Sequence, residues 1–316
     1  MREKGEAWEL RYEEVMELTS ASTASAVPKL LTMKNDSHRS VRCAVASALG
    51  NFPSSKEAFE ALIELLTDPE VWVRIRTVQA LRAFEGSKAP DFLVRQLSTE
   101  EDEKVRATIV KTIGTFGDAR FISNLLPYLK DEDPRVRANT IEGLGFIDSD
   151  ELKETLRPFL CDPNSRIRAN AARIMSTFAD TVGESRSTFE KMLQSGDQYE
   201  RASAAYALGE LGHEVYVTSL LNLLGDRSFV VRRNIVDALS KFGSLIEHRI
   251  AHRLKSDDPT IRACCCEVLG RIGTQACLRS LIPHLDDSDG LVRSSCEKAF
   301  DIIKERQKGL SEEEAS

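Results

Sequence analysis

The chain has 316 residues, with 43 Lys and Arg against 50 Asp and Glu, and its formal net charge is −7. This acidic balance disfavours nonspecific nucleic-acid binding, which needs a positive surface. No stretch approaches the roughly 20 uninterrupted apolar residues of a membrane span, the charged N-terminus lacks the apolar core of a secretory signal, and the seven cysteines have no disulfide-like spacing. We therefore expect a cytoplasmic protein without a membrane span.

The first segment, residues 1–23, predicts a charged capping helix. Trp8, Tyr12 and Val15 share one face of this helix. That face is suited to cover the open end of the array that follows. The segment is interpreted either as a degenerate second helix of a repeat or as a dedicated cap.

From residue 24 to residue 303, a Val-Arg-type pair followed by small and apolar residues recurs nine times. Successive arginines lie 30 to 33 residues apart. A fixed period of this length predicts a solenoid of stacked units. The repeated arginines are Arg42, Arg74, Arg106, Arg137, Arg168, Arg201, Arg232, Arg262 and Arg293.

Each unit is predicted to be a pair of helices, A and then B. Counted from the residue before the repeated arginine, apolar or small residues at 0, +4, +7 and +8 form one face of helix B. A second apolar stretch precedes it, such as residues 58–66, and forms helix A. Ala or Gly at +7 lets a neighbouring helix approach closely. The expected units are residues 24–54, 55–86, 87–117, 118–148, 149–179, 180–212, 213–243, 244–273 and 274–303.

The turn between helices A and B carries an acidic residue in most units. Asp68-Pro69, Asp133-Pro134, Asp162-Pro163 and Asp258-Pro259 fit an Asp N-cap followed by Pro in the first helical turn. We expect the repeated arginines to bridge to these turn acids, which makes the arginines structural. A basic stripe for phosphates is the less favoured alternative, because acids accompany the arginines.

Two places depart from the pattern. In the sixth unit Glu200 replaces the usual Val, Ser195 replaces the turn Asp, and residues 179–186 add length. We expect a change of curvature or a softer joint there. The chain ends in an acidic segment, residues 304–316, which is predicted to be disordered.

The pattern D-x-x-x-x-V-R-x-x-A-x-x-A-L-G resembles the HEAT repeat, and most of all the short variety of phycobilin-lyase-like proteins. The resemblance covers about 280 of the 316 residues. It implies an all-α fold, an α-solenoid or superhelix of about nine stacked helix pairs. It also implies that the B helices line a concave face on which partners bind.

Positions +3, +6 and +10 of the B helices are predicted to face that partner. Asn at +3 in three units suggests an amide ladder that grips an extended peptide. The favoured alternative is that Asn is simply a solvent-facing residue of this repeat. The candidate binding residues are Arg76, Asn139, Glu142, Phe146, Asn170, Arg173, Ser203, Tyr206, Asn234 and Asp237.

No metal, cofactor or catalytic site is predicted. Cys264, Cys265 and Cys266 point about 100° apart on one helix, so they cannot converge on one metal; Cys265 and Cys296 share position +4 and are expected to be near each other. Deoxyhypusine hydroxylases are HEAT-like enzymes that hold iron with repeated His-Glu pairs. Only His213-Glu214 matches that pattern.

The predicted function is a scaffold, adaptor or regulatory subunit without catalysis, which binds another protein or an extended peptide of it. The alternative is an accessory lyase or chaperone-like enzyme that acts on a cofactor-bearing protein, which a deep apolar pocket on the B-helix side would favour. Nucleic-acid binding is less favoured. It would require a continuous exposed stripe of Arg76, Arg173, Arg232, Arg233 and Arg271.

Overall fold

The computed structural model describes residues 7–21, 23 and 25–314, and the secondary structure in this part of the chain is helical without strands. This confirms the all-α solenoid. The chain forms two compact units, residues 1–156 and 157–316, which we call the N-terminal and C-terminal units and describe separately. No helix in the described residues is both long and apolar enough to cross a lipid bilayer.

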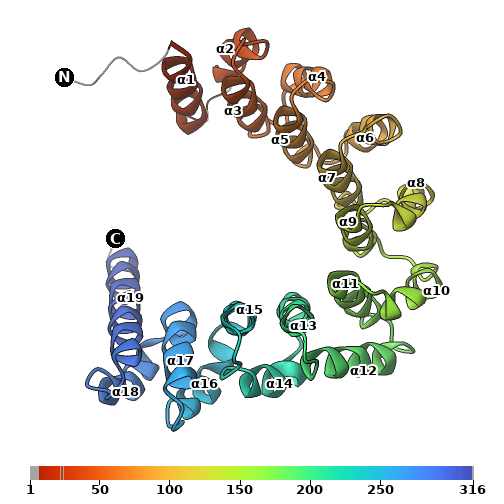
Figure 1. Ribbon diagram of the computed structural model, residues 1–316. Helices are drawn as coiled ribbons and strands as arrows, with labels where there is room; N and C mark the ends of the chain where they lie inside the picture. Colours follow the sequence, from red (N-terminus) through yellow and green to blue (C-terminus); the bar gives the residue numbers. More distant parts are fainter. Residues whose placement is uncertain (1–6, 22, 24, 315–316) are drawn as a thin grey trace. The chain divides into compact units, whose positions relative to one another are not determined.

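The N-terminal unit has two layers of helices (Figure 1). The B layer contains α1 (Ala7–Ala21), α3 (Arg39–Leu49), α5 (Val71–Leu81), α7 (Glu103–Gly114) and α9 (Pro134–Leu144). The A layer contains α2 (Ala26–Met33), α4 (Lys56–Leu65), α6 (Ala89–Leu97), α8 (Ile122–Leu125) and α10 (Leu152–Leu156), and short 3-10 turns, η1 (Ala119–Phe121) and η2 (Leu126–Lys130), flank α8.

The C-terminal unit repeats this arrangement (Figure 1). Its B layer contains α11 (Ser165–Met175), α13 (Gln198–Leu211), α15 (Phe229–Ser240), α17 (Pro259–Ile272) and α19 (Gly290–Glu314). Its A layer contains α12 (Val182–Leu193), α14 (Val217–Asn222), α16 (Glu247–Arg253) and α18 (Leu278–Leu281). The 3-10 segments are η3 (Arg157–Cys161), η4 (Glu214–Tyr216), η5 (Gly243–Ile246), η6 (Gln275–Cys277) and η7 (Ile282–His284).

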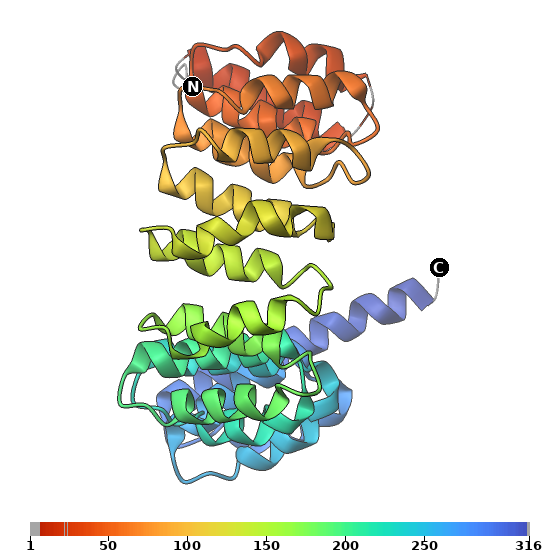
Figure 2. The same cartoon turned by 90° about the vertical axis from the view of Figure 1, so that its right-hand side faces the viewer.

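The structure differs from the predicted boundaries in two respects. The stretch expected to be one domain contains two compact units that divide between Leu156 and Arg157, where α10 gives way to a 3-10 segment containing Pro158. The tail expected to be disordered from residue 304 continues α19 to Glu314 (Figure 2). Its Glu, Lys, Arg and Gln residues are good helix formers, so an established helix can extend through them.

Most B helices begin at a side-chain cap, but α5 and α15 do not, and two of the four Asp-Pro predictions are wrong. Asp133 and Asp258 cap α9 and α17, with Pro as the first helical residue. In contrast, the residues at the N-cap position of α5 and α11 are Glu70 and Asn164, two residues after Asp68 and Asp162. Asp68 instead accepts hydrogen bonds from the Glu70 amide and from an arginine of the preceding unit. Its carboxylate therefore joins units.

Neighbouring B helices approach each other through small residues. The Gly at +9 of one helix lies against the Ala or Gly at +7 of the next, as in Gly114 against Gly143 and Gly209 against Ala238. A Cβ atom on Gly114 would overlap the main-chain carbonyl of Gly143, and one on Gly209 would lie 2.6 Å from the Ala238 Cα atom. The close approach predicted at +7 is thus present, and the Gly at +9 supplies the other half of the contact.

Six of the nine repeated arginines join their own turn to the next unit. In Arg201, Nη1 donates to the Ser195 carbonyl (2.7 Å), while Nε and Nη2 donate to the two carboxylate oxygens of Asp226 (2.7 and 2.9 Å). Burial raises the pKa of Asp226, but the Arg201 and Ser228 hydrogen bonds outweigh this and hold it below its usual value. The arginine–acid pairs are Arg42–Asp68, Arg74–Glu100, Arg106–Asp131, Arg168–Glu200, Arg201–Asp226 and Arg262–Asp287.

Three further repeated arginines contact their own turn. Arg137, Arg232 and Arg293 donate to the main-chain carbonyls of the turn aspartates, which are Asp131, Asp226 and Asp287 in that order. In the capping segment, Arg11 of α1 forms the same bidentate contact with Asp36 (2.5 and 3.0 Å). Arg11 precedes Arg42 by one period, so α1 is a degenerate B helix.

We predict that Gly114→Ala destabilises the N-terminal unit by about 2 kcal/mol, because overpacking at the α7–α9 contact outweighs the better helix propensity of Ala. Gly183→Ala is the matched control, since a Cβ atom on this helical Gly meets no atom within 4 Å. The control should be neutral or more stable by up to about 1 kcal/mol. Urea unfolding measures both, and equal stabilities of the two variants would contradict the packing argument.

We also predict that Arg201→Gln costs about 3 kcal/mol or more, because it leaves the buried Asp226 carboxylate without its cation. The Arg201 and Asp226 side chains are only 7% and 6% exposed. Arg186→Gln, which removes the exposed pair with Glu190, should cost less than about 1 kcal/mol. Hydrogen exchange in α13 and α15 reports the local loss, and similar effects of the two substitutions would refute the structural role of the pair.

Candidate functional site

Exposed aromatic side chains in the described part of the chain lie in or directly beside the B layers. They are Tyr12, Trp72, Phe146, Tyr199, Tyr206 and Phe229. The large exposed apolar residues of the A layers, including their 3-10 segments, are aliphatic: Val182, Val215, Leu245 and Ile282. The two layers of each unit therefore present chemically different surfaces. The B layer offers the flat rings that dominate protein recognition.

Position +3, predicted to face solvent, lies between B helices in most units, although Arg76 at this position is exposed. Asn170 is only 4% exposed, and the Asn139 side-chain amide donates to the Ala107 carbonyl of the preceding B helix (2.9 Å). Ser203 shares a hydrogen bond with Ser165 of α11 (3.1 Å). Position +3 is only about 60° around the helix from the buried residue at 0, whereas +6 is about 120° away.

The expected ladder of amides for a peptide backbone is therefore not displayed. The third member, Asn234, is partly buried and donates to the Val230 carbonyl of its own helix (2.9 Å). Asn139 and Ser203 therefore help hold the B layer together, whereas the Asn234 hydrogen bond lies within its own helix. Sequence spacing missed this because the period gives a residue's position on its helix, but not the direction from which the neighbouring helix packs.

Positions +6 and +10 carry the polar surface, and many of their charges are paired. Lys111 contacts Glu142 (2.8 Å) in the N-terminal unit, and Asp237 contacts Arg271 (2.5 Å) in the C-terminal unit. Each pair joins neighbouring B helices. In the C-terminal unit, Arg232 is engaged by its turn carbonyl, so Arg271 and Arg232 do not form a free basic stripe.

In the C-terminal unit, an aromatic side chain of α13 lies beside an ion pair between α13 and the end of α15. Tyr206 is 48% exposed, and the Lys241 ammonium lies 5.2 Å from its ring centroid while pairing with Glu210. Burial raises the pKa of Glu210, but the Lys241 contact outweighs this and lowers it. About two helical turns towards the N-terminus of α13, Tyr199 is 62% exposed. Arg173, at +6 of α11, is partly buried.

In the N-terminal unit, α1, α3 and α5 enclose a hollow of about 640 Å³, which we call the B-layer hollow. Trp72, Tyr12 and Met16 contribute partly exposed apolar side chains. Arg39 and Arg76 contribute two exposed cations. The hollow shares Ser47, Asn51 and Arg76 with a smaller depression that reaches Gln79 and Ala83. Sequence reasoning named Arg76 but missed Trp72, which precedes the repeat pair by one residue.

The half-buried thiol of Cys43 also lines the B-layer hollow. Burial raises its pKa, against the opposing effect of nearby arginines that include Arg76. A raised pKa keeps the thiol protonated near neutral pH, which makes it a weak nucleophile. We therefore assign Cys43 to the apolar lining.

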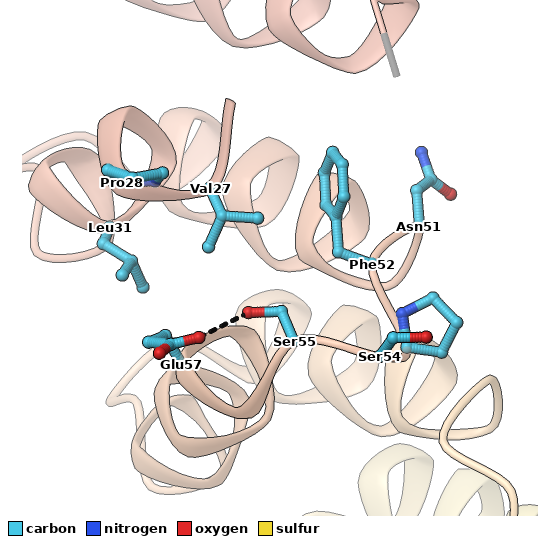
Figure 3. Close-up of a pocket in the computed structure, with 9 residues that line it drawn as sticks. Val27, Pro28, Leu31, Asn51, Phe52, Ser54, Ser55 and Glu57 are labelled. Atoms are coloured by element: carbon cyan, nitrogen blue, oxygen red, sulfur yellow. Dashed lines mark hydrogen bonds between the residues drawn. The ribbon is translucent and has the colours of Figure 1, made fainter. Parts of the chain in front are cut away.

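A second hollow of about 650 Å³ lies beyond the end of α3, between α2 and the start of α4 (Figure 3). Val27 and Leu31 of α2 face Ser55 and Glu57 across it (Figure 3). Ser55 already caps α4 by accepting from the Ala58 amide (3.1 Å), and its hydroxyl donates to Glu57 (2.9 Å). The polar groups of this hollow therefore serve the helix start.

The described residues contain no group of three or more His, Cys, Asp or Glu side chains placed to hold a metal ion. Burial raises the pKa of Cys264 to about 11 and of Cys265 to about 12. The thiol that contacts Cys296 is Cys266, not Cys265 as predicted. His213 and Glu214 are exposed in the turn before α14.

Comparison with known proteins supports the repeat pattern. A family model described as HEAT repeats matches residues 2–82, 59–131, 122–188 and 186–251. Among solved structures, the complex of CpcE and CpcF of phycocyanin lyase from Nostoc is similar with a TM-score of 0.52, at 20% identity, over 76% of this chain and 92% of that one. This likeness concerns the fold.

Curated relatives match part of the chain. Human deoxyhypusine hydroxylase is 31% identical over 114 residues, which cover 35% of this chain and 38% of that protein. The uncharacterized phycocyanin operon protein Z of Pseudanabaena tenuis is 29% identical over 124 residues, 37% of this chain and 61% of that protein. The chain thus spans less than two thirds of the length of either relative.

These relatives correct the prediction that the chain is not an enzyme. Several of them, from human to zebrafish, are named deoxyhypusine hydroxylase, which is an enzyme. The prediction was drawn from the absence of a recognisable catalytic motif. That absence is a poor guide in this fold, because a solenoid can assemble a site from single residues of separate repeats.

Proposed function

Because the chain belongs to the HEAT-repeat family, we propose that it binds a protein partner on its B layers and acts on that partner as an accessory enzyme. The enzyme type that we favour is lyase-like or chaperone-like, acting on a protein that carries a cofactor. The enzymes among the curated relatives and the phycocyanin operon protein support this choice. A scaffold or regulatory subunit would use the same surface but leave the partner chemically unchanged.

The segregation of exposed aromatics to the B layers is the observation that carries the proposal. Protein interfaces draw most of their binding energy from a few aromatic and arginine side chains. Tyr199 and Tyr206 stand on one helix in the C-terminal unit, and Trp72 stands beside Arg76 in the N-terminal unit. An exposed aromatic ring forms few hydrogen bonds with water and has a large apolar area. Burying it against a protein surface is therefore favourable.

The fixed arrangement of the B helices provides the mechanism. Arginine–acid pairs and close helix contacts hold each layer in place before a partner arrives. A preformed surface loses little conformational entropy when it binds. We assign partner contact to Arg76, Phe146, Arg173 and Tyr206, and we add Trp72 and Tyr199. Asn139, Asn170 and Ser203 take structural roles within the layers, while Glu142, Asn234 and Asp237 contribute the polar rim.

We predict that Tyr199→Ala combined with Tyr206→Ala weakens partner binding about 30-fold or more, since one interface anchor contributes about 2 kcal/mol. The matched control is Val182→Ala with Leu245→Ala, which removes exposed apolar groups from the A layer of the same unit. Quantitative affinity capture identifies the partner, and titration of the purified partner measures the loss. Equal binding by both double variants, with the fold intact, would overturn the B-layer assignment.

The enzymatic part has its own test. The captured partner is incubated with its free cofactor, with and without the chain, and intact mass and absorbance follow the covalently bound cofactor. We expect a faster gain or loss of the cofactor in the presence of the chain. If the rate of cofactor gain or loss is unchanged while binding still depends on the B layer, the chain is a scaffold and the proposed enzymatic role is refuted.

A further inference from the structure

The B-layer hollow of the N-terminal unit has a composition that departs from the rest of the chain. Its lining contains two arginines and no Asp or Glu, although the whole chain has a net charge of −7. Elsewhere on the B layers, several cations pair with an acid of a neighbouring helix, as in Asp237–Arg271 and Glu142–Lys111. The hollow is therefore a local positive site on an acidic protein, and it attracts anions.

The two arginines are available to a ligand. Among the described residues, the ion pair of Arg39 is a long contact with Glu70 (3.8 Å), and because both side chains are well exposed, this pair contributes little. Arg76 donates to the side-chain oxygen of Gln79 (3.2 Å), and no carboxylate in the described residues pairs with it. An arginine without an acid offers a planar fork that matches a carboxylate.

Apolar side chains lie beside these cations. Trp72 of α5 is 55% exposed, and Tyr12 and Met16 of α1 are also exposed. All three line the same hollow. Trp and Tyr have few rotatable bonds, and Met adapts to the shape of a partner. Together they form an apolar surface that can contact one aromatic or aliphatic side chain.

The shape favours an extended chain over a compact small molecule. The hollow opens along α3 into the neighbouring depression through Ser47, Asn51 and Arg76. Small-molecule sites are concave and enclose most of their ligand, whereas here many of the lining side chains are exposed. The Ser47, Asn51 and Gln79 side chains supply hydrogen-bond donors and acceptors along this path, as a peptide backbone requires.

We infer that the B-layer hollow binds an extended acidic peptide segment of the partner, with one aromatic side chain against Trp72, Tyr12 and Met16 and flanking carboxylates on Arg39 and Arg76. This inference rests on the proposed function and names the segment that the N-terminal unit recognises. The positive charge of the lining favours acidic residues of the peptide. The apolar side chains of the hollow favour an aromatic residue between those acids. Binding should weaken as salt rises, because exposed charges are screened.

The chain has a built-in reporter for this site. Its two tryptophans are Trp8 and Trp72, and Trp8 stacks on His38 with ring centroids 4.0 Å apart. The Trp8→Phe variant leaves Trp72 as the single indole. Titration of the full-length variant with a blocked Gly-Asp-Phe-Asp-Gly peptide should change Trp72 emission with saturation. Calorimetry on the unmodified chain provides the same affinity and shows whether Trp8→Phe disturbs the site.

Arg76→Gln should weaken this peptide about tenfold or more, because it removes a charge-assisted contact. Arg82→Gln is the matched control: the residue is exposed at the end of the same helix, its loss changes net charge equally, and it does not line the hollow. Trp72→Ala should weaken binding by a similar factor. Equal effects of Arg76→Gln and Arg82→Gln would overturn the inference.

Two further ligands separate the alternatives. A Gly-Lys-Phe-Lys-Gly peptide should bind at least tenfold more weakly than the acidic one, and equal binding would refute charge selection. If 8-anilinonaphthalene-1-sulfonate binds but the acidic peptide does not, the hollow is a site for small flat anions and the inference fails. Loss of the partner on substitution of Tyr199 and Tyr206 would then still sustain the proposed function, because those residues belong to the other unit.

Discussion

The arginine at the start of each B helix is the contact on which the rest of each unit depends. Its guanidinium bonds the carbonyl of its own turn, and in six units it also bonds an acid of the next unit, as Arg201 bonds Ser195 and Asp226. Two such anchor points fix both the distance and the rotation between consecutive helices. Because the acid is nearly buried, the pair cannot be broken without leaving an uncompensated charge. The same contact at Arg11 extends this order to α1.

This constraint also explains how a repeat protein can display a functional surface. Once the arginines set the register and the paired Gly and Ala residues set the spacing, equivalent positions of neighbouring B helices lie on the same face. In most units the +3 position lies between helices, with the exposed Arg76 as an exception, whereas positions −1, +6 and +10 lie on the outside. Trp72 and Tyr199 occupy −1, Tyr206 occupies +6, and Phe146 occupies +10. Conserving the frame while varying these positions lets binding specificity change without cost to the fold.

The sequence was informative where the period alone decides the outcome. The helix pairs, the solenoid and the contact between arginines and turn acids all follow from spacing and charge. It was less informative where tertiary packing decides. Asn170 has a polar side chain and a plausible outward position, but it is only 4% exposed, and the thiol that contacts Cys296 is Cys266. Extending the exposed stripe one turn towards the N-terminus would have found Trp72 and Tyr199. The hollow between α1, α3 and α5 required knowing that α1 continues the B layer.

Site-specific photocrosslinking can show whether a protein partner contacts the B layers. A benzoylphenylalanine is placed at Tyr206 or Trp72 on the B layers, and at Leu245 or Val182 on the A layer, in otherwise unmodified chains. After irradiation with the partner, mass spectrometry locates the adducts. If the partner contacts the B layers, we expect crosslinks from Tyr206 and Trp72, and none from Leu245 or Val182. Crosslinks confined to Leu245 and Val182 would contradict this contact.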